Sequence, residues 1–293
     1  MARQKMVKKI YLLGYPLGHS LSPAMHNAAY RALGLDYVYE KLEVPPADLT
    51  RVLADLRSDP SFWGANITVP HKKAAVALCA ELAAGARECG SVNTLVCRAG
   101  GLTGYSTDGE GYLRSLDMDG IDPRGKKIVL FGSGGAAQAM AYALQKTADK
   151  VWIIVRDLTK APAIIRLFAK FPNLEIIDKK FLLNMPRLLN EADLVINATS
   201  VGMLPDTHST ILPEPGLLAQ IRAGQIFSDI VYHPRRTLFL KNAADRGART
   251  HEGWGMLLWQ GVLAFHLFTG IPLAEIPLDI LKNSLLDNLP AEK

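Results

Sequence analysis

The sequence predicts an α/β protein of two domains: an N-terminal domain with a mostly parallel sheet, and a second domain that opens with a βαβ unit. Three observations support this prediction. The chain has 293 residues, a length that suits two ordinary domains. Short apolar runs alternate with segments of helical periodicity, which is typical of parallel sheets with crossover helices. A glycine-rich turn follows one of the apolar runs and leads directly into a helical segment.

Composition narrows the class of protein. Hydrophobic residues make up 49% and charged residues 21%, as in globular proteins with a full core. The formal net charge of +5 is mild and suits an anionic small molecule better than a nucleic acid, which would require a basic stripe with stacking groups. The three cysteines have no zinc or redox spacing, and the longest apolar stretch is too short to cross a membrane. We therefore expect a cytoplasmic protein with reduced thiols and no bound metal.

The first domain is predicted to span residues 1–108. Ser22 and Pro23 predict a helix with Ser22 as its N-cap and Pro23 at the first helical position, and Gly34 is a suitable stop. Apolar runs and helical spacing supply the other elements. Strands are expected at 9–15, 37–44, 66–69, 92–96 and 102–105, and helices at 23–33, 49–56 and 71–82.

The second domain is predicted to span residues 109–254, and the closing segment 255–293 is expected to complete the first domain. A connecting helix at 109–116 precedes the βαβ unit. That unit comprises a strand from residue 127, a helix at 136–145 and a strand at 151–155. Later elements are strands at 194–198 and 226–230 and helices at 238–244, 255–269 and 278–286.

The glycine-rich turn has the pattern G-x-G-x-x-A directly between a strand and a helix. Gly132 permits the tight turn, Gly134 lets the backbone approach a pyrophosphate, and Ala137 keeps the helix close to the strand. The N-terminus of the helix offers unpaired N–H groups and the positive end of a dipole. A dinucleotide is therefore expected on the residues of this turn, namely Gly132, Ser133, Gly134, Gly135, Ala136 and Ala137.

The next strand ends in residues that bear on the choice of nucleotide. Arg156 can bind the 2′-phosphate of NADP, whereas Asp157 can bind the ribose hydroxyls of NAD. The two residues favour different nucleotides, so we expect NADP as the cofactor and leave NAD open.

Three polar motifs follow strands of the first domain, where ligands of open α/β sheets bind. Each motif alone has an ordinary structural explanation. Together their hydroxyl and amide groups suit a polyhydroxy acid, and Lys72 and Asp108 supply opposite charges suited to moving a proton. The motifs are Ser20-Leu21-Ser22-Pro23, Asn66-Ile67-Thr68-Val69-Pro70-His71-Lys72, and Val92-Asn93-Thr94 together with Ser106-Thr107-Asp108-Gly109.

Two further motifs occupy residues 197–203 (Asn-Ala-Thr-Ser-Val-Gly-Met) and 253–260 (Gly-Trp-Gly-Met-Leu-Leu-Trp-Gln). With all these motifs in order, residues 10–270 resemble the shikimate dehydrogenase family, including its quinate/shikimate branch. The resemblance implies a substrate-binding N-terminal domain, a Rossmann-like NADP-binding domain and a cleft between them. It implies an oxidoreductase that reversibly reduces 3-dehydroshikimate to shikimate with NADPH, a reaction of chorismate and aromatic amino-acid biosynthesis.

The resemblance also implies roles for individual residues. Lys72 and Asp108 would be catalytic, with Lys72 as the acid or base. The substrate would be bound by Ser20, Ser22, Thr68, Lys72, Asn93, Asp108, Tyr232 and Gln260. The nucleotide would be bound by the glycine turn together with Arg156, Asp157, Thr199, Val201, Gly253 and Met256.

Two alternatives stay open. One is a quinate/shikimate dehydrogenase that uses NAD, since the stretch Gly255 to Gly261, with Leu-Leu-Trp-Gln-Gly, is similar to the branch that also accepts quinate. The other is a ligand-sensing protein on the same scaffold without catalysis, which the presence of Lys72 and Asp108 disfavours. No nucleic-acid or membrane partner is expected, and a homodimer is the open candidate for the assembly.

Overall fold

The computed structural model describes residues 6–18, 20–99, 101–179 and 185–290. By its contacts the chain divides into two compact units. The first unit contains the chain up to Thr107 together with Gln260–Leu289, and the second contains Asp108–Trp259. The chain therefore leaves the first unit after Thr107 and re-enters it at Gln260, in the middle of helix α10 (Trp254–Thr269).

The first unit is built on a six-stranded sheet in the order β2-β1-β3-β5-β6-β4. β1 pairs in parallel with β2 and β3, β5 runs antiparallel to β3 and β6, and β4 is parallel to β6. The sheet is therefore mostly parallel, as predicted. The bounds are β1 (Lys8–Gly14), β2 (Tyr37–Glu43), β3 (Phe62–Ile67), β4 (Glu81–Leu82), β5 (Thr94–Arg98) and β6 (Gly101–Tyr105).

The register of this sheet brings several chain segments to one edge. Asn66, at the end of β3, pairs with Thr94, at the start of β5. Thr94 also pairs with Tyr105, at the end of β6. Because β5 is antiparallel to its neighbours, its start lies beside their ends. The residues that follow β1, β3 and β6 and precede β5 therefore meet at the same edge.

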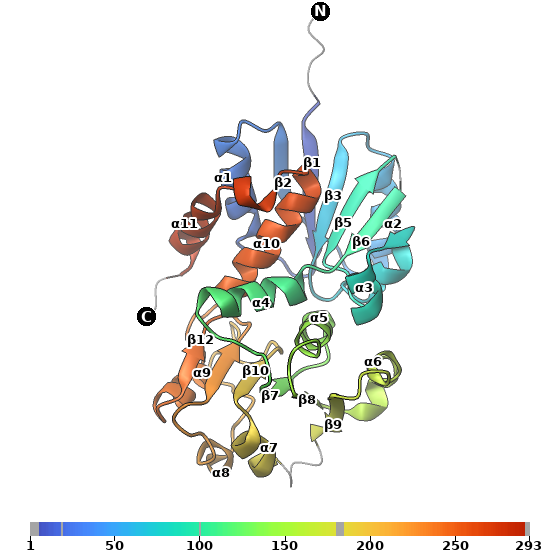
Figure 1. Ribbon diagram of the computed structural model, residues 1–293. Coiled ribbons are helices and arrows are strands. Elements are labelled where there is room, and N and C mark those ends of the chain that lie inside the picture. Colours follow the sequence, from blue (N-terminus) through green and yellow to red (C-terminus); the bar gives the residue numbers. More distant parts are fainter. Residues whose placement is uncertain (1–5, 19, 100, 180–184, 291–293) are drawn as a thin grey trace, which may run out of the picture. The chain divides into compact units, whose positions relative to one another are not determined.

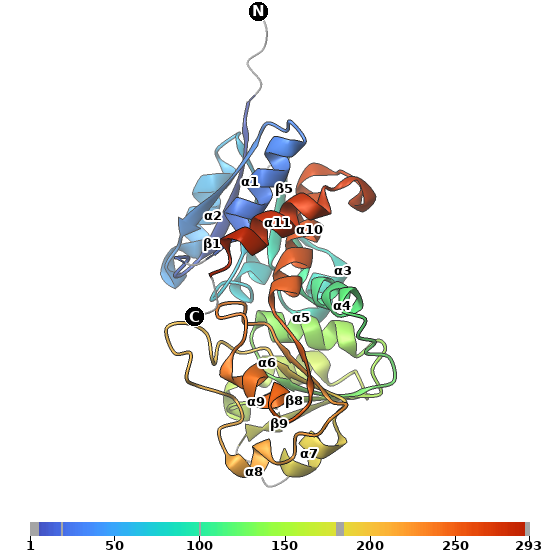
Figure 2. The same cartoon turned by 90° about the vertical axis from the view of Figure 1, so that its left-hand side faces the viewer.

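Helices cover both faces of the first sheet. α1 (Ser22–Ala32) lies beside α11 (Leu278–Asn288) in both views (Figures 1 and 2). The C-terminal half of α10 packs on the same face, where Phe268 lies against the strand residue Gly64. The opposite face is covered by α2 (Leu49–Arg57) and α3 (Ala84–Cys89), with Leu49 and Leu53 in its core. The connections include short 3-10 helices, η1 (Pro46–Asp48), η2 (Ala74–Leu78) and η5 (Leu273–Glu275).

Several elements of the first domain differ from the prediction: β3 begins at Phe62 instead of residue 66, β5 begins at Thr94 instead of residue 92, and α3 was not predicted. Two further differences concern predicted helices. α1 begins at Ser22 itself, with Leu21 as its N-cap, so the prediction of Ser22 as the cap was wrong by one residue. The predicted helix 71–82 is only the 3-10 helix η2 followed by β4. The backbone of Ala80 and Ala83 instead donates hydrogen bonds to Leu102 and Gly104, so pairing with β6 outweighs the helix propensity of an alanine-rich segment.

The second unit has a six-stranded, fully parallel sheet in the order β12-β11-β10-β7-β8-β9. This is the strand order of a doubly wound dinucleotide-binding fold, and its direction of winding changes between β7 and β10. β9 and β12 were not predicted from the sequence. The bounds are β7 (Lys127–Phe131), β8 (Lys150–Val155), β9 (Leu174–Asp178), β10 (Leu194–Asn197), β11 (Ile226–Asp229) and β12 (Arg249–His251).

Helices lie on both faces of this sheet (Figures 1 and 2). One face is covered by α4 (Asp108–Met118), α5 (Gly135–Leu144) and α6 (Pro162–Phe168), whose buried residues share one hydrophobic cluster. The other face is covered by α7 (Met185–Glu191), α8 (Pro215–Leu218) and α9 (Leu238–Ala244). Among the described residues no helix is long and apolar enough to cross a membrane.

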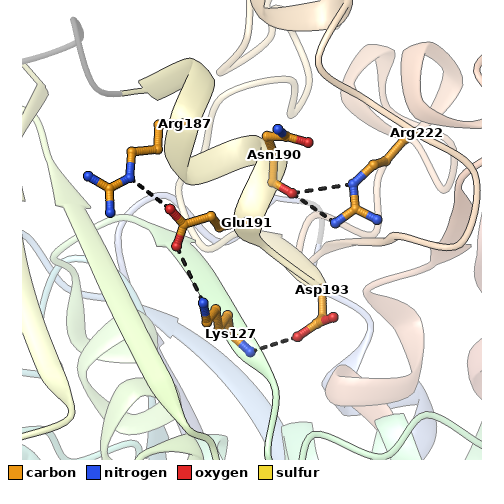
Figure 3. Close-up of polar contacts among 6 residues, drawn as sticks. All are labelled: Lys127, Arg187, Asn190, Glu191, Asp193 and Arg222. Atoms are coloured by element: carbon orange, nitrogen blue, oxygen red, sulfur yellow. Dashed lines mark hydrogen bonds and ion pairs between the residues drawn. The ribbon is translucent and has the colours of Figure 1, made fainter.

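A polar network fastens α7 to the amino ends of β7 and β10 (Figure 3). Glu191 accepts a hydrogen bond from Arg187 at 2.7 Å and one from the Lys127 ammonium at 3.4 Å. The Asp193 carboxylate accepts the backbone N–H of Lys127 at 2.8 Å. These contacts lie at the edge opposite the glycine turn, so they support the sheet and leave its carboxyl edge to the site.

Candidate functional site

Asn93 is the centre of a buried polar cluster at the carboxyl edge of the first sheet. Its Oδ1 accepts the backbone N–H of Thr107 at 2.8 Å and the hydroxyl of Thr94 at 3.2 Å. Its Nδ2 donates to Thr107 Oγ1 at 2.8 Å and to Gln260 Oε1 at 3.4 Å. The structure therefore brings together Asn93 and Gln260, two of the predicted substrate residues, from segments 167 positions apart.

Ser20 and Ser22 lie at the N-terminus of α1 on the same unit. The Ser20 hydroxyl is 3.4 Å from both the hydroxyl and the backbone nitrogen of Ser22. Ser22 also hydrogen-bonds the hydroxyl of Tyr39, which opposes the rise in the pKa of Tyr39 caused by its burial. Tyr39 in turn donates to Asn66 Oδ1 at 2.8 Å. The serine pair is thus connected through buried side chains to the end of β3.

Asn66 extends this connection to the central cluster. Its Nδ2 donates to the carbonyl of Asn93 at 3.1 Å and to the hydroxyl of Thr94 at 2.9 Å. Tyr39 was not among the predicted site residues, because an aromatic residue in a strand usually indicates only core packing. Its partner Asn66 lies 27 positions away, so no local spacing signals the contact.

The segment from Thr68 to Lys72 is anchored by contacts of Thr68 and His71 with neighbouring segments. Thr68 donates its N–H to Leu13 at 2.9 Å, and its methyl group lies where a Cβ on Gly14 would clash. His71 is buried, and its Nε2 is 2.7 Å from the carbonyl of Val44. Since a carbonyl only accepts, Nε2 carries the proton, and this bond anchors the residue that precedes Lys72.

Lys72 is half-buried, and its carbonyl accepts the N–H of Val92 at 2.9 Å. Asp108 is 2% exposed and is the first residue of α4. Lys72 belongs to the first unit and Asp108 to the second. Their pairing therefore stays a prediction.

The glycine turn of the second unit has the geometry expected for a nucleotide site. Gly132 has φ +128°, and a Cβ there would lie 2.8 Å from the carbonyl oxygen of Ala198. Gly134 is the N-cap of α5, and a Cβ on it would meet nothing within 4 Å. The protein's own packing therefore requires glycine at 132 but leaves the space over Gly134 open, as an approaching phosphate needs.

Arg156 and Asp157 differ in what they already bind. Arg156 is exposed at the carboxyl end of β8. Asp157 instead caps the 3-10 helix η3 (Leu158–Lys160), and its Oδ1 accepts the backbone N–H and the hydroxyl of Thr159 at 3.0 and 2.6 Å. The carboxylate that would bind NAD ribose thus has a local structural role, while the guanidinium that would bind a 2′-phosphate faces solvent.

Thr199 and Val201 lie in a loop that Asn197 organises from the end of β10. Asn197 Oδ1 accepts the backbone N–H and the hydroxyl of Thr199 at 3.1 and 2.7 Å. Its Nδ2 donates to the carbonyl of Val201 and to Asp229, both at 3.0 Å. The sequence motif at 197–203 includes Asn197 without indicating this role, because its partner Asp229 lies 32 positions away.

Asp229 is fully buried at the end of β11. It accepts hydrogen bonds from the hydroxyl of Thr237 at 2.7 Å and the backbone N–H of Val231 at 2.9 Å, besides that from Asn197. Burial raises the pKa of Asp229 to about 6, although these hydrogen bonds oppose the rise. Asp229 thereby fixes the backbone directly before Tyr232, whose own pKa is also raised by burial.

Gly253 and Met256 complete the predicted nucleotide residues of the second unit. A Cβ on Gly253 would lie 2.5 Å from the carbonyl of Ile230, so this position requires glycine. Met256 is 6% exposed and belongs to the core cluster of that unit. Among the residues that the structure describes, no three histidine, cysteine or acidic side chains gather as metal ligands would.

Comparisons with known proteins agree with this geometry. The family model "Shikimate dehydrogenase substrate binding domain" matches residues 12–95. A curated shikimate dehydrogenase (NADP(+)) of Methanopyrus kandleri is 39% identical over 286 residues, covering 95% of this chain and 94% of that protein. The crystal structure of shikimate 5-dehydrogenase from Thermus thermophilus in complex with NADP(H) and shikimate is 33% identical with a TM-score of 0.83, covering 96% of this chain and 100% of that one.

A second solved structure bears on the alternative substrate. Quinate dehydrogenase from Corynebacterium glutamicum in complex with NAD is 30% identical with a TM-score of 0.82. The match covers 96% of this chain and 99% of that chain. The fold is thus shared by proteins named for different substrates.

Proposed function

Because the chain belongs to the shikimate dehydrogenase family, we propose that it catalyses the reversible NADPH-dependent reduction of 3-dehydroshikimate to shikimate. The observation that carries the substrate assignment is the buried cluster of Asn93, Thr107 and Gln260. Its amide and hydroxyl groups lie at the sheet edge where open α/β sheets bind ligands, and they suit a ring with several hydroxyl groups. The product feeds chorismate and aromatic amino-acid biosynthesis.

In this proposal, each group of residues in the first unit has one task. Ser20 and Ser22 hold the substrate carboxylate, with Tyr232 contributing from the second unit. Thr68, Asn93 and Gln260 bind the ring hydroxyls. Since Asn93 is buried and its amide is fixed by several hydrogen bonds, these contacts require little reorganisation when the substrate binds.

Lys72 is the residue proposed to move the proton. In the reducing direction its ammonium donates a proton to the carbonyl oxygen at C3 of the substrate, and Asp108 holds the lysine in place. The hydrogen bonds of His71 to Val44 and of Val92 to the Lys72 carbonyl anchor the backbone around Lys72. The lysine side chain therefore starts from a fixed point near the substrate ring. When bound, NADPH supplies the hydride.

The residues present fit NADP. Gly132 and Gly134 let the backbone approach the pyrophosphate, Gly135 to Ala137 open α5 behind it, and exposed Arg156 is suited to the 2′-phosphate. Asp157 lies beside Arg156 at the adenosine end. Thr199, Val201, Gly253 and Met256 line the nicotinamide side.

One observation favours a second candidate function. The similarity to a quinate dehydrogenase in complex with NAD, together with Asp157 beside Arg156, makes a quinate/shikimate dehydrogenase that uses NAD the alternative. We further propose that the enzyme acts in the cytoplasm, and a homodimer is the assembly to test by sedimentation.

The deciding experiment is a four-way kinetic comparison. Reduction of NADP and of NAD, each at a saturating concentration, is followed over a range of shikimate concentrations and over a range of quinate concentrations. We expect the highest kcat/KM with shikimate and NADP. A higher kcat/KM for quinate with NAD would establish the alternative, and no nicotinamide absorbance change with any pair would instead favour a sensor without catalysis.

A further inference from the structure

Thr107 lies where the chain leaves the first unit, directly before Asp108. Its side chain is 5% exposed, and its hydroxyl joins two segments that are far apart in sequence. Thr107 Oγ1 accepts a hydrogen bond from Asn93 Nδ2 at 2.8 Å and donates one to the main-chain carbonyl of Gln260 at 3.0 Å. The Thr107 hydroxyl thus contacts the side chain of Asn93 and the backbone of Gln260, and both of these are proposed substrate residues.

The backbone of Thr107 adds a third bond to the same cluster. Its N–H donates to Asn93 Oδ1 at 2.8 Å. The Asn93 amide is therefore held from both ends by one residue, because Nδ2 meets the Thr107 hydroxyl and Oδ1 meets the Thr107 N–H. This arrangement defines which end of the Asn93 amide is the donor toward Gln260 Oε1, 3.4 Å away.

The hydrogen bond from the Thr107 hydroxyl to the Gln260 carbonyl also joins two parts of the chain. Gln260 is the residue at which the chain re-enters the first unit within α10. The hydrogen bond from Thr107 to Gln260 therefore fastens the outgoing and the returning segments of the chain to each other, inside the first unit. It fixes the turn of α10 from which the Gln260 side chain extends.

We propose that Thr107 is a positioning residue for the substrate: its hydroxyl sets the orientation of the Asn93 amide and the placement of Gln260. The inference rests on the proposed shikimate dehydrogenase activity. Thr107 itself needs no contact with the substrate for this role. Loss of the hydroxyl would leave one N–H of the buried Asn93 amide without its acceptor and would release the backbone carbonyl of Gln260. Both side chains would then be held less firmly, so binding of the ring hydroxyls would weaken.

Thr107→Val removes the hydroxyl and keeps the branched shape of the side chain. We expect the KM for shikimate to rise roughly tenfold, the effect of one hydrogen bond in a desolvated site. The KM for NADP should stay within about twofold of the wild-type value, because the second unit is untouched. Thr107→Ser restores the hydroxyl and should return the KM for shikimate to within about threefold of wild type.

Thr269→Val is the matched control. The Thr269 hydroxyl also donates to a carbonyl of α10, that of Phe265 at 2.8 Å, and it contacts none of the predicted substrate residues. This variant should lose stability without a change in the KM for shikimate. A merely structural role for Thr107 would make the two valine variants behave alike, with lower stability and unchanged KM.

A double-mutant cycle tests the route of the effect. If Thr107 acts through Asn93, Thr107→Val should raise the KM for shikimate much less in an Asn93→Ala background than in the wild type. Should Thr107→Val fail to fold by circular dichroism, the comparison of Thr107→Ala with Thr107→Ser carries the same test. A KM for shikimate within about twofold of wild type in the hydroxyl-free variant overturns the proposal. Wild-type protein that does not oxidise shikimate with either nucleotide overturns the proposed function itself, and the role of Thr107 with it.

Discussion

Asn197 and Asp229 hydrogen-bond each other across neighbouring strands, with Asn197 Nδ2 3.0 Å from Asp229 Oδ1. The pair joins the carboxyl ends of β10 and β11. Asn197 also closes the loop of Thr199 and Val201, while Asp229 fixes the backbone before Tyr232. Two loops proposed to face the nicotinamide and the substrate are therefore set by one buried pair.

The first prediction follows from the pKa of Asp229, which burial raises to about 6. The folded state holds this proton more tightly than the unfolded state, so its contribution to stability is present at low pH and is lost as pH rises through about 6. From pH 5 to pH 7 we expect Asp229 to lower the free energy of unfolding by about 1 kcal/mol. Urea unfolding of wild type and Asp229→Asn at both pH values measures the difference, and equal pH dependence in the two proteins would contradict it.

His26 gives a pH dependence of the opposite sign. It is fully buried in α1, its ring stacks on Tyr39 with centroids 4.4 Å apart, and neither ring nitrogen has a hydrogen-bond partner among the described residues. Burial lowers the pKa of His26 to about 3. The unfolded state therefore takes up the proton first, and stability is lost as pH falls below about 6.5.

Between pH 7 and pH 5, His26 should lower the free energy of unfolding by about 2 kcal/mol. His26→Phe keeps an aromatic ring in the stack and should lack this loss. Denaturant unfolding at the two pH values provides the measurement. If the phenylalanine variant is as acid-sensitive as wild type, His26 does not titrate on unfolding as proposed.

The glycine turn offers a contrast between two substitutions. Gly132→Ala places a Cβ 2.8 Å from a carbonyl oxygen at φ +128°, so we expect a loss of stability of about 1–3 kcal/mol or more. Gly134→Ala meets no atom within 4 Å, so the protein should fold, with at most about 1 kcal/mol lost from the N-cap of α5. Its expected defect is a higher KM for NADP. Thermal unfolding combined with nucleotide kinetics separates the two, and a normal KM for NADP in Gly134→Ala would count against a pyrophosphate over this residue.

Arg156 is expected to determine the preference for NADP. Arg156→Gln removes the charge suited to a 2′-phosphate and should lower kcat/KM for NADP roughly 10- to 100-fold, with little change for NAD. Arg166→Gln, which removes the charge of an exposed arginine in α6, is the control. The ratio of kcat/KM for the two nucleotides is the readout. An unchanged ratio in Arg156→Gln would assign the preference to other residues.

Lys72→Ala tests the proposed proton donor. Loss of a general acid should reduce kcat about 10²- to 10⁴-fold, while shikimate binding changes far less. Lys73→Ala, at the next position, is the control for a change of charge in this segment. Steady-state kinetics and equilibrium binding of shikimate provide the two readouts. Near-normal kcat in Lys72→Ala would remove Lys72 from the chemistry.

Much of this architecture could be predicted from the sequence, for identifiable reasons. The turn at Gly132 is a local pattern in which each small residue has a distinct steric cause, so it is visible in a few consecutive letters. The meeting of Asn66, Asn93 and Thr107 follows from strand ends sharing one sheet edge. The buried partners were not predictable in the same way. Tyr39 and Asp229 act through residues more than twenty positions away, and β4 forms only because β6 offers it an edge.

The route of the chain through the two units has a consequence for its synthesis. The first unit is interrupted after Thr107 and resumes only at Gln260, and its helix α1 packs beside α11, which ends at Asn288. A ribosome makes the chain from the N-terminus, so α1 emerges long before its neighbour exists. The whole nucleotide-binding unit is translated in between. The apolar face of α1 therefore stays uncovered until α11 has been synthesised, and the first unit can be completed only after the second unit has been translated.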